Sequence, residues 1–403
     1  MRLSHLRILF ATLASVGLIL GSLLPAAAIP VFARKYGYNC TMCHSNYPRL
    51  NDWGTRFRMN GYQVPGQEQE EKTVLETSAP FAARTSFGYT RDTFTNTPGA
   101  DDLRHFQLNS LDLLSGGLVG RNLGYFVVYP PKLEGSASVV AQPGTLEMAN
   151  LIFSHLASRW LNVRAGRFEP ASLAFSDKRR LSVAPYEVYN FAFPGGPAFS
   201  DTQTGLEITG SRWSGFSYAA GWVNGTDNAF LDDSPSDFYV RAQQVFGAGE
   251  GMTAGQRVGL VGYWGKARPA GLTSSTPRES FRRYGLDASV NLRHTNLALE
   301  YLQGRDAAEL WPSAPGSVSF SGGFAELTHM PAINWVGFLR YDLVNTPDWL
   351  NEDVRRWTVG ARYYPVDQVA LHLEYSRRTQ DPGRETTAQQ QETLLTARAD
   401  LAF

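Results

Sequence analysis

Residues 40–44 read Cys-Thr-Met-Cys-His, and they contain the only two cysteines of the 403-residue sequence. Two close thiols in an exported protein can form a disulfide, a redox dithiol, half of a zinc site or the attachment site of a haem. A tetrahedral zinc site needs a second pair of ligands, and the sequence has no second cysteine pair. A redox dithiol would be expected beside a βαβ pattern, which the flanking sequence lacks. The histidine after the second cysteine therefore decides the interpretation.

A C-x-x-C-H motif is the attachment pattern of c-type haem. Its two thiols form thioether bonds with the haem vinyl groups, and the adjacent imidazole reaches the iron from one face. We therefore predict one covalent haem c, with Cys40 and Cys43 as attachment sites and His44 as the proximal iron ligand. A plain disulfide between Cys40 and Cys43 is the alternative.

The sequence after the motif predicts one short helix over residues 47–62. Pro48 suits the first turn of a helix, and Gly61 suits its end. Apolar residues at spacings of three and four form a stripe that could cover the porphyrin. The members of this stripe are Leu50, Trp53 and Phe57.

Met59 is the obvious candidate for a second axial ligand of the iron. At about 100° per residue, however, Met59 points away from Leu50 and Phe57, so it cannot reach an iron that the stripe covers. A ligand from the barrel, a water molecule and an open position remain as alternatives. The arginines that could pair with haem propionates, or could simply be solvated, are Arg34, Arg49 and Arg56.

The first residues predict export from the cytoplasm. Arg2 and Arg7 precede an apolar run over residues 8–24, and small residues up to Ala28 follow it. This is the pattern of a secretory signal peptide over residues 1–28, cleaved after Ala28, and an uncleaved membrane anchor is the alternative. Cleavage removes two of the 37 basic residues and none of the 37 acidic residues, which leaves a small negative net charge. Such a balance gives no reason to expect a nucleic-acid partner.

The pattern changes after the cytochrome-like segment at residues 29–62. Residues 63–80 are polar and charged and read as a linker, and from Phe81 onward apolar and polar residues alternate with period two, as in residues 284–293 and 369–376. Beyond the leader no apolar run is long enough for a membrane-spanning helix, so a membrane protein of this sequence must cross as a closed barrel. A soluble β-sandwich would alternate too, with its apolar face turned inward.

Sixteen strand-like runs can be counted from residue 81 to the C-terminus at residue 403. They start near residues 81, 102, 118, 146, 159, 204, 215, 236, 256, 281, 295, 318, 333, 354, 368 and 391. Tight joints are expected at residues 115–117, at Ser158 and at His294 with their neighbours, and at residues 365–367. Short turns that alternate with long loops are typical of outer-membrane barrels, and an even count brings both chain ends to the periplasmic side. The final run ends at Phe403, a terminal aromatic that resembles the recognition signal of such barrels.

A barrel of sixteen strands should enclose a lumen. The residues expected to point into it are Arg164, Asp287, Arg293, Glu300, Arg362, His372 and Glu374. They can be ordinary lumen-lining charges, or some of them can contact the haem segment as a plug. Carboxylates of the long loops, such as Asp232 and Asp348, could gather divalent iron or manganese, although acidic surface loops are common.

Residues 32–62 resemble the N-terminal signature of outer-membrane monohaem cytochrome–porin fusions, a family associated with extracellular ferrous-iron oxidation. The matching positions are Phe32-Ala33-Arg34, Cys40, Cys43, His44, Pro48, Leu50, Gly54, Phe57-Arg58 and Gly61-Tyr62. The resemblance implies a short c-type cytochrome joined to a barrel of sixteen strands, with Cys40 and Cys43 as attachment sites and His44 as axial ligand. It leaves the second ligand open and covers about 31 residues.

These features support three hypotheses about function. The first is electron transfer across the outer membrane of a Gram-negative bacterium, from extracellular Fe(II) to a periplasmic carrier such as a soluble cytochrome, with possible ferrous-iron oxidase activity. The second is a diffusion porin whose haem segment is a structural plug or a redox sensor. The third is a soluble periplasmic cytochrome with an unrelated β domain, which the loop pattern disfavours.

Overall fold

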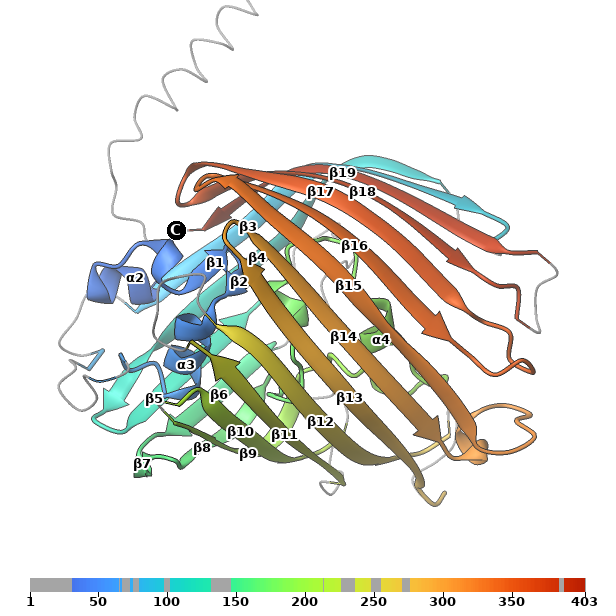
Figure 1. The fold of residues 1–403 in the computed structure, drawn as a ribbon, viewed down its shortest axis with the longest axis horizontal. Helices are drawn as coiled ribbons and strands as arrows, with labels where there is room; N and C mark the ends of the chain where they lie inside the picture. The colour runs from blue at the N-terminus through green and yellow to red at the C-terminus, as the bar shows by residue number, and fades with distance from the viewer. Residues whose placement is uncertain are drawn as a thin grey trace, which may run out of the picture.

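The structure is a computed structural model that describes residues 31–64, 66, 73–74, 80–97, 102–131, 146–212, 214–225, 236–247, 255–269, 276–383 and 388–402. Within these residues, sixteen antiparallel strands form a closed barrel (Figure 1). They are β3 (Phe81–Thr95), β4 (Leu103–Gly120), β5 (Leu123–Tyr129), β6 (Met148–Phe153), β8 (Asn162–Phe168), β9 (Gln203–Ser211), β10 (Phe216–Val223), β11 (Asp237–Phe246), β12 (Gln256–Ala267), β13 (Glu279–Leu292), β14 (Thr295–Asp306), β15 (Val318–Ala332), β16 (Trp335–Asn345), β17 (Val354–Val366), β18 (Val369–Gln380) and β19 (Gln390–Ala402). The predicted sixteen-stranded barrel is confirmed.

The barrel turns its apolar residues outward and its charged residues inward. Leu286, Leu373 and Trp357 are each more than half exposed on the outer surface. Six of the seven predicted lumen residues are buried on the inner side, and Arg293 lies in the exposed turn between β13 and β14. This arrangement excludes the β-sandwich, which would bury its apolar face. It suits a bilayer, because every backbone group of a closed barrel can be paired within the sheet.

The helices of the described chain are all short. They are α2 (Val31–Tyr36), η1 (Cys40–Met42), α3 (Asp52–Met59), η2 (Asp177–Arg179), α4 (Glu187–Asn190) and η3 (Ala308–Leu310). None of the helices in the described ranges is long and apolar enough to cross a membrane.

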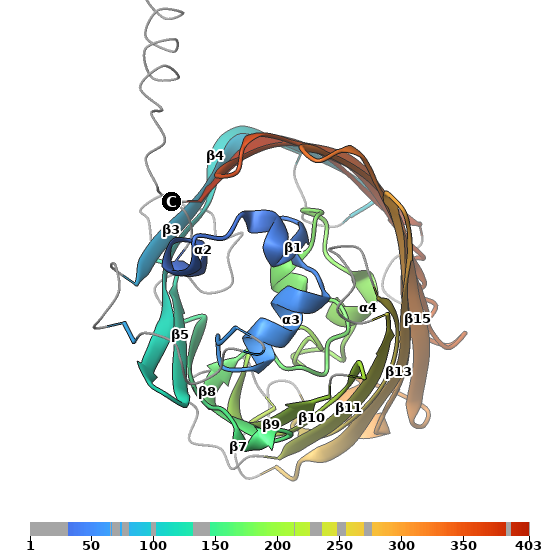
Figure 2. The same ribbon diagram turned by 60° about the vertical axis from the view of Figure 1, so that its left-hand side comes forward.

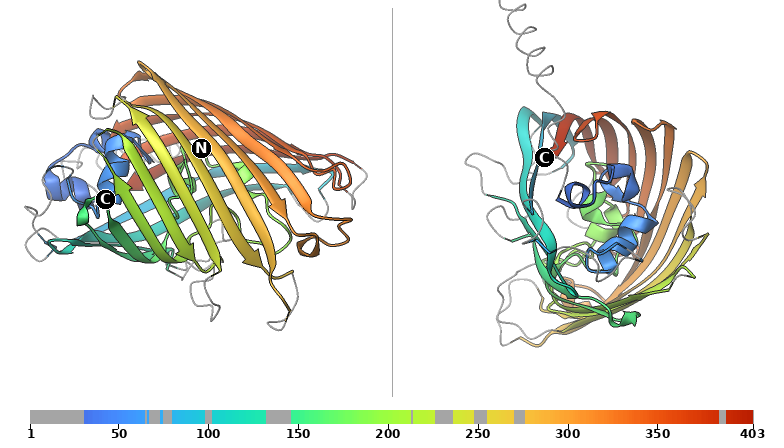
Figure 3. Two further views of the ribbon diagram at one scale, coloured as in Figure 1. Left: turned by 60° about the horizontal axis from the view of Figure 1, so that its bottom comes forward. Right: turned by 90° about the vertical axis from the view of Figure 1, so that its left-hand side faces the viewer.

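The connections between strands differ in length at the two ends of the barrel. Residues 121–122, 293–294, 333–334 and 367–368 form two-residue turns at one end. The opposite end carries the long connections, such as residues 169–202. The first strand begins and the last strand ends at the short-turn end, where the N-terminal segment, residues 31–64, also lies (Figure 3).

One predicted tight joint lies elsewhere in the structure, and two others lie at or close to their predicted places. Residues 115–117 are part of β4, which continues to Gly120, so the turn comes later than predicted. Ser158 does lie in the connection between β6 and β8, which runs over residues 154–161 and includes a short extra strand, β7 (Leu156–Arg159). The turn predicted at residues 365–367 is found at residues 367–368. The glycine that suggested a turn at Gly116 has another use. A Cβ there would lie 2.9 Å from Phe126 and 3.0 Å from Phe32, so glycine lets the N-terminal segment pack closely against β4.

The N-terminal segment enters the mouth of the barrel at the short-turn end (Figure 2). Tyr364 Oη of the wall donates to the Tyr47 carbonyl at 2.6 Å, and Gln63 Nε2 donates to Ser154 Oγ at 2.9 Å. The segment contains a small hairpin of β1 (His44–Asn46) and β2 (Arg49–Leu50) before α3. The predicted helix is therefore shorter than residues 47–62. Pro48 lies in the hairpin turn instead of the first helical turn. The helix α3 begins only after Asn51, which caps it by accepting the Gly54 N–H at 2.8 Å.

The long connection at residues 169–202, here called the inner loop, folds into the lumen from the opposite end. It carries η2 and α4, and its Leu181, Tyr186 and Tyr189 are fully buried. Arg340 of β16 holds it by donating to the carbonyls of Ala184 and Pro185 at 2.9 and 2.6 Å. Within the described part of the chain, two segments thus enter the lumen, one from each end (Figure 2).

We predict that Arg340→Ala releases the inner loop from the barrel wall. Arg340 is fully buried and also donates to Asp342 at 2.7 Å, so the substitution leaves that carboxylate buried without its partner and costs about 3–5 kcal/mol. Limited proteolysis of the folded barrel should then cut within residues 169–202, and the free energy of unfolding in urea should fall.

Arg355→Ala is the matched control for this substitution. Arg355 lies on the neighbouring strand, its side chain is 44% exposed, and it pairs with Asp353 at 3.7 Å. An exposed pair of this kind contributes about 0–1 kcal/mol, so the control should resist protease like the parent protein. Equal protease resistance in the two variants would contradict the role given to Arg340.

Candidate functional site

The three residues of the C-x-x-C-H motif line one cavity between the N-terminal segment and the barrel wall. We call it the thiol cavity, and Cys40, Cys43 and His44 all contribute to it. Aromatic side chains of the segment surround them, and the wall adds mostly small or apolar side chains. The aromatic lining residues are Phe32, Tyr36, Tyr38, Tyr47, Trp53, Phe57, Tyr62 and Phe126. Cysteine and histidine side chains are therefore brought together against an apolar surface inside the barrel mouth.

Local hydrogen bonds hold the motif against α3. Asn51 donates from its backbone N–H to the Cys43 carbonyl at 2.9 Å and from Nδ2 to the Met42 carbonyl at 3.0 Å. Gly54 in α3 packs so closely that a Cβ would lie 2.1 Å from the Cys43 carbonyl oxygen. Any other residue at Gly54 would push α3 off the motif, so the sequence positions the helix by the absence of a side chain there.

His44 has one ring nitrogen fixed by the hairpin. Its Nδ1 lies 3.0 Å from the Pro48 carbonyl, which can only accept, so Nδ1 carries the proton and Nε2 has a free lone pair. Histidines that bind metals are commonly oriented by such a bond from the other nitrogen. Burial lowers the pKa of His44 to about 4, although the hydrogen bond to Pro48 acts in the opposite direction. The imidazole is therefore neutral near pH 7, the state in which it can bind a metal.

The two thiols are free rather than joined in a disulfide. Burial raises the pKa of Cys40 to about 11, with a further contribution from Asp367, and burial next to Cys40 raises the pKa of Cys43 to about 12. Both side chains are neutral thiols near pH 7. Two thiols, an imidazole with a free nitrogen and an apolar lining are residues that could hold a haem.

Met59 lies apart from the motif. Trp53 and Phe57 face the thiol cavity, whereas Met59 lines a second cavity on the opposite face of α3 together with Asp52 and Thr55. The structure therefore does not bring Met59 together with His44, in keeping with the angular argument from the sequence.

The arginines proposed for propionates have other partners. Arg49 forms an ion pair with Glu326 of β15, and Arg56 pairs with Asp52 one turn earlier in α3. Of Arg34 only the backbone is described. The cations that line the thiol cavity are Arg58, Arg84, Lys178 and Arg179. Three of these come from β3 and the inner loop, and no local sequence pattern could have placed them beside Cys40.

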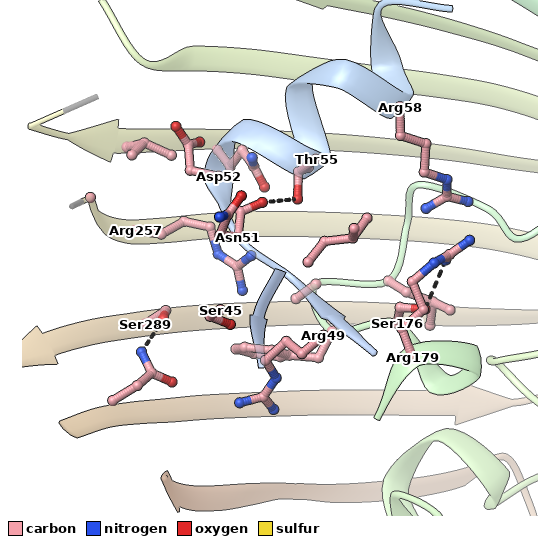
Figure 4. A pocket seen from close by; sticks show the side chains of 18 of the residues that line it. Ser45, Arg49, Asn51, Asp52, Thr55, Arg58, Ser176, Arg179, Arg257 and Ser289 are labelled. Carbon is pink, nitrogen blue, oxygen red and sulfur yellow. Dashed lines mark hydrogen bonds between the residues drawn. The ribbon is translucent and has the colours of Figure 1, made fainter. Parts of the chain in front are cut away.

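The second cavity lies between α3 and strands β10 to β15, and its lining is rich in arginine, so we call it the arginine cavity (Figure 4). Its arginines are Arg49, Arg58, Arg164, Arg179, Arg241, Arg257 and Arg293. Several carboxylates compensate these charges, as Asp287 does for Arg241 at 2.6 Å. Of the described residues that line the cavity, only Asp52 and Glu169 are acidic, so the described surface that faces the cavity is mainly cationic.

A metal site made of loop carboxylates finds no support in the described residues. They contain no group of three or more His, Cys, Asp or Glu side chains suited to a metal ion. Asp237 is a buried structural carboxylate that accepts from Tyr263 Oη at 2.6 Å and from the Lys266 N–H at 3.0 Å. Asp232 lies outside the described residues.

Comparisons with known proteins identify the fold alone. No protein-family model and no curated protein matches the sequence. Among solved structures, the chain is similar to an anion-selective porin from Comamonas acidovorans, with a TM-score of 0.58, 13% identity and coverage of 80% of this chain and 99% of the porin. For the outer-membrane channel DcaP of Acinetobacter baumannii the TM-score is 0.58 at 10% identity, with coverage of 80% of this chain and 97% of the channel. For OprB of Pseudomonas putida the TM-score is 0.57 at 10% identity, with coverage of 80% of this chain and 94% of OprB. The barrel is therefore porin-like.

We predict slow alkylation of both thiols in folded protein prepared without haem. The ordinary pKa of a cysteine, 9.0, is raised to about 11 for Cys40, so the reactive thiolate is about a hundredfold scarcer near neutral pH. Above its pKa of 9.0 an ordinary thiol is labelled by iodoacetamide at a rate that no longer rises with pH. In the same pH range the labelling rate of the folded protein should still rise. The same chain in denaturant is the control, and identical pH profiles for the two states would show that the thiols are not buried.

Proposed function

We propose that this protein transfers electrons across an outer membrane through one c-type haem held inside a porin-like barrel. The observation that carries the proposal is the thiol cavity, where Cys40, Cys43 and His44 meet at one apolar surface. A disulfide, the alternative use of these cysteines, would leave the fixed imidazole of His44 without a purpose. The residues of the cavity fit a haem in their chemistry, and the two cysteines and the histidine follow the C-x-x-C-H order along the chain.

Cys40 and Cys43 would hold the haem by thioether bonds, and His44 would bind its iron through Nε2. When bound, the haem supplies reversible one-electron chemistry, which no other group of this chain offers at low driving force. The bond from His44 Nδ1 to the Pro48 carbonyl fixes the ring for this role. The aromatic lining would exclude water from the haem. Arg84, Lys178 and Arg179 place positive charge at the cavity edge, although each is already paired with a carboxylate of the chain, namely Asp112, Glu147 and Glu169.

The barrel supports a location in the outer membrane. Its outward apolar residues fit a lipid bilayer, and its short turns and long connections occur at opposite ends, as in bacterial outer-membrane barrels where short turns are periplasmic. The N-terminal segment lies at the short-turn end, so the haem would be near the periplasm. A periplasmic carrier such as a soluble cytochrome would take the electron, and extracellular Fe(II) is the donor that the family resemblance suggests.

A second candidate function is diffusion of solutes, with the haem segment as a plug or redox sensor. The similarity to porins favours it, and so does the arginine cavity, which lies in the lumen beside α3. The two functions make different demands. Electron transfer needs the haem to change oxidation state, whereas diffusion needs a continuous aqueous path.

Electron transfer is tested with purified protein in liposomes that contain a trapped electron acceptor. We predict that added Fe(II) reduces the haem and then the acceptor, and that Cys43→Ala abolishes covalent haem and the transfer together. Met59→Leu, a change on the other face of α3, is the control and should leave both intact. Haem that stays oxidised in the presence of Fe(II) would contradict the donor, and normal covalent haem in Cys43→Ala would contradict the attachment site.

Diffusion is tested by the current through single proteins in a planar bilayer. We predict that any conductance favours anions, because arginines dominate the surface of the arginine cavity. Arg293→Gln, at the exposed turn that borders the cavity, should shift the reversal potential toward cations, while the control Arg355→Gln should shift it less. A preference for cations in the parent protein would contradict this path, and the lack of any current would exclude the second function.

A further inference from the structure

We infer that Met148 supplies the second axial ligand of the haem, an inference that rests on the proposed function. The sequence alone leaves this ligand open. The thiol cavity narrows the choice, because the two axial ligands of a flat porphyrin approach the iron from opposite faces. If His44 binds from the N-terminal segment, the second ligand belongs to the side of the cavity formed by the barrel wall and the inner loop.

Met148 faces that side of the cavity from the first position of β6. Along this strand Met148, Asn150 and Ile152 are buried, while Leu151 and Phe153 are about 40% exposed on the outer surface. The thioether of Met148 therefore points into the barrel, where it lines the same cavity as Cys40 and His44. Met148 is separated from the motif by more than a hundred residues, and the closure of the barrel brings the two together.

Among the residues that the structure describes, the other side chains on that side of the cavity are poor ligands. Apart from Met148, the wall contributes alanine, leucine, valine and phenylalanine side chains and Arg84, which is paired with Asp112. The inner loop contributes Lys178 and Arg179. A guanidinium has no acceptor, and neither has a protonated ammonium such as that of Lys178, which lies 3.5 Å from Glu147. The thioether sulfur of Met148 is a soft ligand with a free lone pair.

The backbone at Met148 is held by pairing with Val128 of β5 and by two hydrogen bonds at the preceding residue, Glu147. The Glu147 N–H donates to the Val128 carbonyl at 3.0 Å, and Arg167 Nε donates to the Glu147 carbonyl at 3.2 Å. The methionine side chain itself is unbranched and adaptable, so it can adjust to an iron without movement of the strand. A firm backbone with an adaptable sulfur suits a ligand that must approach a haem attached to the opposite side of the cavity.

Ligation by methionine and histidine has a functional consequence. This pair of axial ligands raises the reduction potential of a haem. A higher potential favours acceptance of electrons from a weak reductant, which is the demand that oxidation of Fe(II) makes. Ligation by Met148 would therefore tune the haem for the donor proposed above.

The test compares Met148→Leu with Met59→Leu in the full-length, haem-loaded protein. Both changes exchange methionine for a side chain of similar volume. Met148 lines the thiol cavity, whereas Met59 lines the arginine cavity on the other face of α3. We expect Met148→Leu to keep its covalent haem, to lose the weak long-wavelength absorption band of a thioether–ferric iron bond and to shift to a lower reduction potential. Met59→Leu should retain both the band and the potential of the parent protein.

The outcomes separate the two proposals. Parent protein that carries no covalent haem overturns the proposed function itself. Parent protein with haem but without the band, or Met148→Leu with an unchanged band and potential, overturns only the role of Met148. Should Met148→Leu fail to fold, Met148→His provides a second reading, because a histidine there should retain the haem, abolish the band and lower the potential.

Discussion

A strand barrel in a bilayer has to pair its last strand with its first, and here β19 pairs with β3 from Ala402↔Arg84 to Gln391↔Thr95. Closure leaves no unpaired edge in the sheet, so the outer surface can be apolar all round. The same closure confines polar chemistry to the lumen. Sixteen strands enclose more space than their own side chains fill, and that space accommodates segments from outside the sheet. The N-terminal segment and the inner loop use it from opposite ends.

The two inserted segments hold each other as well as the wall. Arg58 of α3 lies 3.4 Å from Glu169 at the start of the inner loop, and Arg179 of the same loop pairs with Glu169 at 2.6 Å. Burial alone would raise the pKa of Glu169, but Arg179 and Arg58 outweigh it and lower the pKa to about 2. A lowered carboxyl pKa stabilises the folded state above the ordinary value of 4.5, and this contribution is lost only as the pH falls toward about 2. The contact between the two segments therefore persists into acid.

The sequence predicted what depends on local pattern. Alternation with period two located all sixteen strands, because the face of a barrel strand is set by each residue and its neighbours. The one marked error in a start, near residue 118 instead of Leu123, came from reading Gly116 as a turn when it serves as a packing position for Phe32. The inward fold of residues 169–202 could not be foreseen, since it depends on Arg340 and other wall residues far along the chain. The same holds for Met148, which lines the same cavity as His44 only because the sheet closes.

The N-terminal segment is too short to be a domain without support. Chains below about 40 residues seldom bury enough surface to fold alone. Here Phe57, Tyr62 and Val64 form a buried cluster that Ile152 of β6 completes, with Phe126 of β5 packed against it. The aromatic residues that would cover a porphyrin are thus positioned partly by the barrel wall. Attachment of the haem to Cys40 and Cys43 would add a covalent constraint to the same cluster, so the cytochrome-like segment and the barrel are best regarded as one folding unit that shares a core.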